Sequence, residues 1–370
     1  MTERSGPGGG VDADLDAIDI SGTLQKQAWD DDVLPPVESL GAGLWSVPVP
    51  IPQNSLRYVL VYLLELDDGV AMIDAGWDTE EAWNALNGGL GKAGYEIGDV
   101  KSVLVTHIHP DHYGLAGRVR EASGAWIALH PADAEILPQR YVQMDDLLTR
   151  MRGHLLESGV PVDSLDSMRG ASMPVRGFVH AVLPDVLLED GDRPEISGWN
   201  LRAVWTPGHS PGHLCFYDAD RRLLLSGDHV LPRITPNISY HPQQTSNPLA
   251  DFLDALDKVA ALDVGEVLPA HEYRFIGLAE RVQGLRGHHE ARLGEVMTAL
   301  RAAPGLNSVQ VAEALRWSRP WDQMLGIQRR FAIGEAYSHL IHLEHTGYIA
   351  NKGIDIDDWH AVSESSPKLI

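Results

Sequence analysis

Three histidines and one aspartate lie within six consecutive positions, in a segment that reads Thr-His-Ile-His-Pro-Asp-His-Tyr-Gly-Leu-Ala-Gly. They are His107, His109, Asp111 and His112. Imidazole and carboxylate groups together suit borderline divalent metals. A histidine tract without function is repetitive in composition, whereas the histidines of this segment are interleaved with proline, aspartate and glycine. The segment therefore predicts a metal site.

A rigid element must hold these side chains, because a metal site needs several groups that converge with little ordering on binding. The apolar run Val103 to Val105 lies just before the segment and predicts a strand there. Side chains alternate along an extended chain, so His107 and His109 project to the same side. A helix that begins just afterwards turns Asp111 and His112 toward a neighbouring point. This geometry predicts two adjacent metal ions.

The pattern His-x-His-x-Asp-His resembles the hallmark of the metallo-β-lactamase superfamily. Four further segments resemble the other motifs of that family, and they follow in the family's order. The resemblance covers roughly residues 40 to 280. The four segments are Met72 to Trp77 with Asp74, Thr206 to His213 with His209, Ser226 to Asp228, and Leu268 to His271.

The resemblance implies a role for each of these residues. Two divalent ions, zinc by default with iron or manganese as alternatives, share a hydroxide that attacks an electrophilic carbonyl or phosphorus. Asp111 lies beside this nucleophile and orients it, and Asp74 supports the ligands from behind. The implied ligands are His107, His109 and His209 for one ion, Asp111, His112 and His271 for the other, and Asp228 as the bridge.

The same resemblance narrows the reaction. The segment Thr-Pro-Gly-His-Ser-Pro-Gly-His, together with a bridging aspartate, resembles the glyoxalase II and lactonase branches. It implies hydrolysis of a small ester, thioester or lactone, although the basic residues that hold glutathione in glyoxalase II have no match. The alternatives are a metal-dependent phosphodiesterase or ribonuclease, and a β-lactamase-like amide hydrolase. A binding protein with a vestigial site is disfavoured, because no ligand position has been replaced.

The elements that position the ligands form a regular series. From Leu44 onward, strand-like runs alternate with helical patterns, and the ligand segments follow strands. This alternation predicts a layered α/β sandwich, and the resemblance implies four αββα layers for a catalytic domain over residues 41–280. Within it, residues 138–178 predict a helical insertion, because Met144, Leu147, Leu148, Met151, Leu155 and Leu156 recur at helical spacing. By the resemblance, this insertion lies near the active site.

Both ends of the chain differ from this catalytic region. Residues 1–40 hold nine acidic and two basic side chains, and we expect an acidic, mobile arm. Residues 281–370 are mostly helical and end in the strand-like Tyr348-Ile-Ala, a succession that resembles a winged-helix module. They carry ten basic and ten acidic residues, so a packing or dimerisation role is favoured over nucleic acid binding.

Polar residues beside the ligand segments are candidates for binding the substrate. Tyr113 adjoins the histidine cluster, and the loop after Asp228 carries Arg233, Asn237 and Tyr240. Such loops often hold binding residues on a rigid scaffold, but each of these three could instead tie the loop down. Among the other histidines, His213 and His229 could support ligands and His288 and His289 could line the pocket. We expect no function for His154, His180, His241, His339, His342, His345 and His360.

Charge and composition narrow the choice of partner. The formal net charge is −23, which opposes nonspecific binding to nucleic acid or anionic lipid and favours a small-molecule substrate. No apolar run is long enough to cross a membrane, and the first residues lack the apolar core of a secretory signal, so we expect a cytoplasmic protein. The single cysteine, Cys215, cannot form an intrachain disulfide, and its strand-like surroundings predict a buried thiol.

Overall fold

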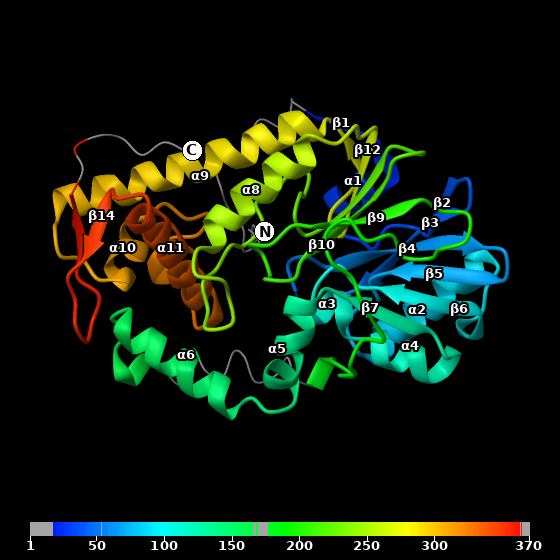
Figure 1. The fold of residues 1–370 in the computed structure, drawn as a ribbon, viewed down its shortest axis with the longest axis horizontal. Helices are drawn as coiled ribbons and strands as arrows, with labels where there is room; N and C mark the ends of the chain where they lie inside the picture. Colours follow the sequence, from blue (N-terminus) through cyan, green and yellow to red (C-terminus); the bar gives the residue numbers. More distant parts are fainter. Residues whose placement is uncertain (1–17, 53, 166–167, 169–176, 363, 365–370) are drawn as a thin grey trace.

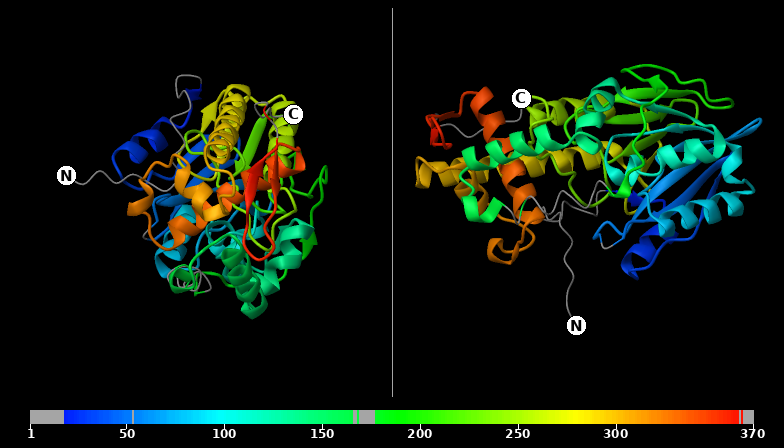
Figure 2. Two further views of the ribbon diagram at one scale, coloured as in Figure 1. Left: turned by 90° about the vertical axis from the view of Figure 1, so that its left-hand side faces the viewer. Right: turned by 90° about the horizontal axis from the view of Figure 1, so that it is seen from below.

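The computed structural model describes residues 18–364, except 53, 166–167, 169–176 and 363. Two β-sheets lie at one end of the molecule, and helices cover their outer faces (Figure 1). Figure 2 shows the same arrangement along two perpendicular directions, with the C-terminal helices at the end opposite to the N-terminal sheet. No helix among the described residues is long and apolar enough to span a membrane.

The N-terminal sheet has seven strands, in sequential order from β2 to β8. Strand β4 is buried on both faces, because Tyr58 to Leu64 is an unbroken apolar run. The pairs from β2 to β5 are antiparallel, whereas those from β5 to β8 are parallel. The strands are β2 (Glu38–Gly41), β3 (Leu44–Pro50), β4 (Tyr58–Leu66), β5 (Gly69–Ile73), β6 (Val100–Leu104), β7 (Trp126–Leu129) and β8 (Val186–Leu187).

The second sheet has six strands in the order β1-β13-β12-β11-β10-β9. Strands β11 and β12 pair in parallel, so the loops that follow them leave the sheet at the same edge. The strands are β1 (Asp19–Ile20), β9 (Leu201–Trp205), β10 (Leu214–Asp218), β11 (Leu223–Gly227), β12 (Glu266–Pro269) and β13 (Phe275–Ile276).

Three hydrophobic clusters separate four layers. One lies between the two sheets, and a second joins the outer face of the seven-stranded sheet to its helices. The third joins the six-stranded sheet to the C-terminal helices. The predicted layered α/β sandwich is therefore confirmed. The helices on the first sheet are α2 (Glu80–Ala93), α3 (Pro110–Tyr113), α4 (Ala116–Ser123) and α5 (Pro131–Tyr141), and α8 (Pro248–Ala260) covers the second.

Residues 18–40 do not form the mobile arm that their acidic composition predicted. Strand β1 pairs with β13, and helix α1 (Thr23–Asp30) buries Ala28 and Trp29. The buried Gln25 donates to Ser46 Oγ at 3.0 Å and accepts from the Arg274 backbone N–H at 3.0 Å. The burial of a few side chains thus holds this segment in place despite its exposed acidic residues. The prediction of a mobile arm was wrong for residues 18–40. Residues 1–17 lie outside the described residues.

The predicted insertion contains helix α6 (Asp145–Glu157) and a short 3-10 helix, η3 (Val162–Ser164). Helix α6 lies opposite the C-terminal helix α11 (Ile327–His345), on the lower side of the view in Figure 1. Much of the rest of the insertion, residues 166–167 and 169–176, falls outside the described residues. The helix expected from the spacing of Met144 to Leu156 is confirmed.

The C-terminal part shares its core with the second sheet. Helix α9 (Leu278–Ala302) runs through the predicted boundary at residue 281, and one hydrophobic cluster extends from β11 to α11. Helix α10 (Ser308–Ala314) begins with a capping box formed by Asn307 and Gln310. After α11, strands β14 (Ile349–Asn351) and β15 (Trp359–Ala361) form an antiparallel hairpin. The likeness to a winged helix stays a prediction.

The thiol of Cys215 is fully buried in β10, as predicted. Burial raises its pKa to about 12, so the reactive thiolate is scarce at neutral pH. We expect N-ethylmaleimide at pH 7.5 to leave the folded protein unmodified, and to add one label per chain after denaturation in guanidinium chloride. Mass spectrometry of the intact chain measures both. Rapid labelling of the folded protein would contradict this burial.

Candidate metal centre

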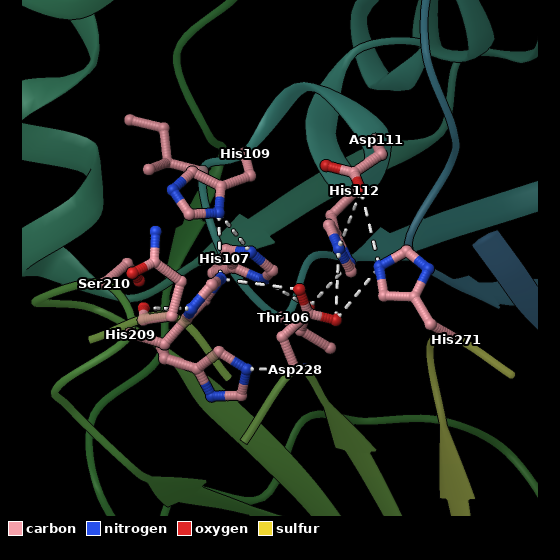
Figure 3. A network of polar contacts seen from close by, with 12 residues as sticks. Thr106, His107, His109, Asp111, His112, His209, Ser210, Asp228 and His271 are labelled. Carbon is pink, nitrogen blue, oxygen red and sulfur yellow. Dashed lines mark hydrogen bonds and ion pairs between the residues drawn. The ribbon is translucent and has the colours of Figure 1, made fainter. Parts of the chain in front are cut away.

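The predicted ligands come together from four separate places in the sequence. His107 and His109 follow β6, and Asp111 and His112 lie on the short helix α3. His209 lies in the tight loop between β9 and β10, Asp228 follows β11, and His271 follows β12. Figure 3 shows His107, His109 and His209 on one side, and Asp111, His112 and His271 on the other. Three overlapping triads have ligand atoms within 4.8 Å of one another, and they include all seven residues.

The first triad consists of three imidazoles. His109 Nδ1 lies 2.9 Å from His107 Nε2 and 3.0 Å from His209 Nε2. Burial lowers the pKa of each of these histidines, and the neighbouring imidazoles add to the effect. The rings are therefore neutral near pH 7 and keep lone pairs for a cation. Three nitrogen donors of this kind are able to hold a divalent metal ion.

The second triad consists of Asp111, His112 and His271, so it combines a carboxylate with two imidazoles. His271 Nε2 lies 3.4 Å from Asp111 Oδ2 and 3.1 Å from Asp228 Oδ1, and His112 Nε2 lies 3.6 Å and 3.5 Å from the same two oxygens. The other oxygen of Asp228, Oδ2, lies 3.4 Å from His209 Nε2. Asp228 therefore directs one oxygen to each triad.

Three buried atoms at this site lie close to one another but form no well-directed hydrogen bond among the described residues: His112 Nε2, His271 Nε2 and Asp228 Oδ1. A buried polar atom without a partner is costly, and a cation between these atoms would satisfy all three. Burial alone would lower the pKa of His271, but the carboxylates of Asp228 and Asp111 raise it to about 10. This strong anionic environment and the orphaned atoms fit a bound metal cation.

Hydrogen bonds behind the site fix the ring orientations. The Nδ1 atom of His112 contacts Asp74 Oδ2 at 2.8 Å, and that of His271 contacts the Tyr58 carbonyl at 2.8 Å. His209 Nδ1 contacts the Asn237 carbonyl at 3.0 Å. In each case the acceptor favours a proton on Nδ1, so Nε2 is the nitrogen that is directed at the site and would bind a cation there in place of a proton.

Asp74 lies behind the cluster, where the sequence predicted a supporting residue. Its Oδ1 accepts from the Thr106 N–H at 2.7 Å, and its Oδ2 accepts from Thr106 Oγ1 at 2.9 Å as well as contacting His112. Asp74 has a φ of 62°, a left-handed conformation that costs energy in a residue other than glycine. The backbone strain and the three contacts indicate that this carboxylate is held in one position.

Asp133 in α5 is a supporting residue that the sequence did not reveal. Its Oδ2 accepts from the Ile108 N–H and from Ser210 Oγ, both at 2.9 Å, and its Oδ1 accepts from the Gly212 N–H at 2.7 Å. A Cβ on Gly212 would lie 2.6 Å from the Asp133 nitrogen, so glycine permits the close approach. This one carboxylate ties the His107 loop to the His209 loop. The only sequence signal was an acid in the first turn of a helix.

The two histidines proposed as supports differ in their surroundings. His213 Nε2 accepts from the Asp228 backbone N–H at 3.1 Å, and its Nδ1 contacts Thr206 Oγ1 at 2.8 Å. It therefore holds the backbone of Asp228 in place. His229 instead packs against Phe252, and neither of its ring nitrogens has a hydrogen-bond partner among the described residues.

Two of the four substrate candidates point elsewhere. Tyr113 is fully buried, and its hydroxyl contacts the backbone N–H and carbonyl of Val182. Arg233 forms an ion pair with the buried Glu272, with Nε and Oε1 3.1 Å apart. Both residues anchor the chain and neither lines the cavity at the site, so the structure does not support a substrate role for them. Adjacency in sequence to the ligands had suggested that role.

A cavity of about 480 Å³ opens onto the site. Asn237 and Tyr240 line it, together with His288, whereas His289 contacts His339 within the C-terminal core at 3.1 Å. His154 and His241, for which no function was expected, also line this cavity. Its wall away from the ligands is mostly apolar. The apolar residues are Met144 just before α6, Leu147, Leu148, Met151 and Leu155 from α6, and Met324, Ile327, Phe331 and Ile333 from the C-terminal part.

Comparisons with known proteins agree with this arrangement. The family model described as the metallo-beta-lactamase superfamily matches residues 55–271. The chain is 26% identical to the probable metallo-hydrolase YqjP of Bacillus subtilis over 230 residues, which are 61% of this chain and 70% of YqjP. It is 29% identical over 198 residues to the acyl-coenzyme A thioesterase MBLAC2 of Homo sapiens, covering 52% of this chain and 62% of that protein.

A solved structure of a metallo-beta-lactamase family protein from Thermus thermophilus is 30% identical and has a TM-score of 0.74. The match covers 87% of this chain and all of that one. It therefore extends beyond the segment recognised by the family model and includes part of the C-terminal helices. The chain belongs to the metallo-beta-lactamase superfamily and is a hydrolase of that superfamily.

Proposed function

We propose that this protein hydrolyses small thioesters, with oxygen esters and lactones as related substrates, at a centre that holds two divalent ions. The observation that carries this proposal is the cavity, which joins the Asp111 and Asp228 carboxylates to a long apolar wall. An apolar acyl group would bind such a wall by removing its own surface from water. The name of the relative MBLAC2, an acyl-coenzyme A thioesterase, supports a thioester among the candidates.

One ion would bind His107 Nε2, His109 Nδ1 and His209 Nε2. The other would bind Asp111, His112 and His271, and Asp228 would give one oxygen to each. Zinc is the first choice for such ligands, and iron or manganese would be accepted by the same set. When bound, the ions supply Lewis acidity and lower the pKa of water, so that hydrolysis proceeds near neutral pH.

The side chains contribute position and proton transfer. Asp111 lines the cavity, and its carboxylate would orient the attacking water and accept its proton. As the new carbon–oxygen bond forms, the carbon–sulfur bond of the thioester breaks, and the proton passes from the Asp111 carboxyl group to the departing sulfur. The products are a carboxylic acid and a thiol. The apolar wall excludes other water from the reacting carbonyl.

We further infer that the C-terminal part, whether or not it is a winged helix, serves as a wall of the substrate cavity. Met324, Ile327 and Phe331 line the cavity, and the balanced charge of residues 281–370 gives phosphate backbones little to bind. This favours a small molecule over nucleic acid as the substrate.

A substrate panel tests this proposal. We expect the metal-loaded protein to hydrolyse acyl thioesters at least about tenfold faster, in kcat/KM, than β-lactams or phosphodiesters. Treatment with a chelator should abolish the activity, and zinc, iron or manganese should restore it. Metal analysis of the purified protein should find two ions per chain. Faster cleavage of a phosphodiester or a β-lactam would replace thioester hydrolysis by one of the alternatives.

A further inference from the structure

Four arginines line the cavity, Arg140, Arg292, Arg319 and Arg330, and the proposed reaction uses none of them. Arg140 lies near the end of α5, and Arg330 lies in the first turn of α11. Both side chains line the same cavity, although they come from helices that are far apart in the sequence. The chain has a formal net charge of −23. Arg292 already pairs with Glu295 and Glu335, whereas the charges of Arg140 and Arg330 repel each other.

Arg140 lies close to the ligands, and none of the carboxylates that the structure describes forms an ion pair with it. The hydroxyl of the next residue, Tyr141, donates to the Ile108 carbonyl at 2.6 Å, which places this turn of α5 against the histidine motif. The Arg140 guanidinium contacts Gln243 Oε1 at 3.4 Å, a long contact with a neutral group. Among the residues that the structure describes, no Asp or Glu oxygen lies within 4.0 Å of its nitrogens. Within the described part of the chain, its guanidinium thus forms no ion pair with an acidic side chain, although its charge partly offsets the rise that burial causes in the pKa of Asp133.

Arg330 brings a second positive charge to the same space. Its Nη1 lies 3.7 Å from Met151 Sδ on α6, and its guanidinium carbon lies 5.3 Å from the ring centroid of Phe331. Burial lowers the pKa of Arg330 to about 10, and repulsion from Arg140 contributes. It remains protonated at neutral pH. The two arginines are near enough to act together on His241, whose pKa is lowered by burial, then by Arg140 and then by Arg330.

Two like charges in a partly buried cavity repel each other, and an anion bound there would remove that cost. Guanidinium groups bind carboxylates and phosphates through paired N–H donors. The apolar residues Leu147 and Leu148 of α6, and Met144 directly before this helix, line the same cavity. Cationic and apolar walls together fit an amphipathic molecule with a negative charge.

We propose that Arg140 and Arg330 bind an anionic group of the substrate, a carboxylate or a phosphate, while the apolar wall of α6 binds its acyl chain. This inference rests on the proposed thioesterase function for the reaction, and it adds the class of substrate, an anionic acyl thioester. The anion can belong to the acyl group or to the thiol carrier, and both sources offer the same chemistry to the arginines.

Matched substrates separate these two sources. The first pair is S-hexanoyl-N-acetylcysteamine and S-adipoyl-N-acetylcysteamine, which differ by a carboxylate at the end of the acyl chain. The second pair is S-hexanoyl-pantetheine and S-hexanoyl-4′-phosphopantetheine, which differ by a phosphate on the thiol carrier. With the metal-loaded full-length protein, we expect the anionic member of one pair to have a kcat/KM about tenfold or more above its neutral partner.

Arginine variants test which side chains give that preference. Arg140→Met and Arg330→Met should each bring the ratio of anionic to neutral kcat/KM close to one, and Arg140→Lys should keep part of the preference. The matched control is Arg118→Met on α4, which loses a surface ion pair with Glu80 and does not line the cavity. It should keep the full ratio. Equal rates within both pairs, or a ratio that survives in the Arg140 and Arg330 variants, would overturn the assignment.

A second readout does not depend on turnover. Titration calorimetry of n-octyl phosphate into the metal-loaded protein should show binding about tenfold weaker in Arg140→Met than in the unchanged protein or in Arg118→Met. If none of the thioesters is hydrolysed but this difference is found, the proposed reaction fails while the anion site stands. If the thioesters are hydrolysed but neither the rate ratio nor this affinity responds to Arg140, the anion site fails alone.

Discussion

The variant Asp228→Ala is expected to lose hydrolytic activity by roughly 10³-fold or more and to bind metal weakly at both positions. The reason lies in its two oxygens. Oδ1 lies 3.1 Å from His271 Nε2, and Oδ2 lies 3.4 Å from His209 Nε2, so this one carboxylate serves both triads. Alanine removes both oxygens and leaves the two triads without the carboxylate that lies between them.

Metal analysis and steady-state kinetics on the same preparations measure this effect. The matched control is Asp220→Ala, an exposed aspartate in the turn after β10, which should keep its metal and activity. His339→Ala is a second control, because it removes a buried imidazole from the C-terminal core and should lower stability without emptying the site. Full activity in Asp228→Ala would overturn the bridging role, and loss of only one ion would assign Asp228 to one triad.

The first four ligands were predictable from the sequence because they lie close together in the chain. His107, His109, Asp111 and His112 follow one strand directly, so their convergence needs little more than the local chain direction. The distant ligands His209, Asp228 and His271 could be placed only because their segments resemble family motifs. No spacing or periodicity in the sequence says that the loops after β9, β11 and β12 meet at one edge of a sheet. The structure shows that they do.

The layered sandwich was predictable for a similar reason. Runs such as Tyr58 to Leu64 are apolar without interruption, and such runs are typical of strands that are covered on both faces. The packing of residues 18–40 was not predictable, because it depends on a few long-range contacts. Trp29 and Gln25 are single residues in an acidic stretch, and nothing local indicates that they bury themselves against a distant strand.

The residues that support the ligands also differ in how far the sequence could predict them. Asp74 was identified because it lies in a segment that resembles a family motif. Asp133 lies at the start of a helix without such a motif, and its carboxylate accepts hydrogen bonds from two loops that are distant in the sequence. Tyr113 and Arg233 were chosen for their closeness in sequence to ligands, yet their side chains turn toward Val182 and Glu272. Closeness in sequence gives the position of the backbone, and it does not give the direction of the side chain.

Asp133→Ala is the second variant for which we expect a large effect. It would leave the N–H groups of Ile108 and Gly212 and the hydroxyl of Ser210 without their acceptor, all of them buried. We expect a loss of about 2–4 kcal/mol in the free energy of unfolding. Because the same carboxylate ties the His107 loop to the His209 loop, we also expect metal affinity and kcat to fall by about 10–100-fold.

Asp133→Asn separates position from stability. It keeps the shape of the side chain, but its amide nitrogen cannot accept from whichever donor it faces, so its effects should fall between those of aspartate and alanine. Glu135→Ala, an exposed change on the same helix, is the matched control. Competition with a zinc chelator gives the metal affinity, and urea unfolding gives the stability. If Asp133→Ala lowered stability while zinc affinity stayed unchanged, the carboxylate would hold the fold together without positioning the metal ligands.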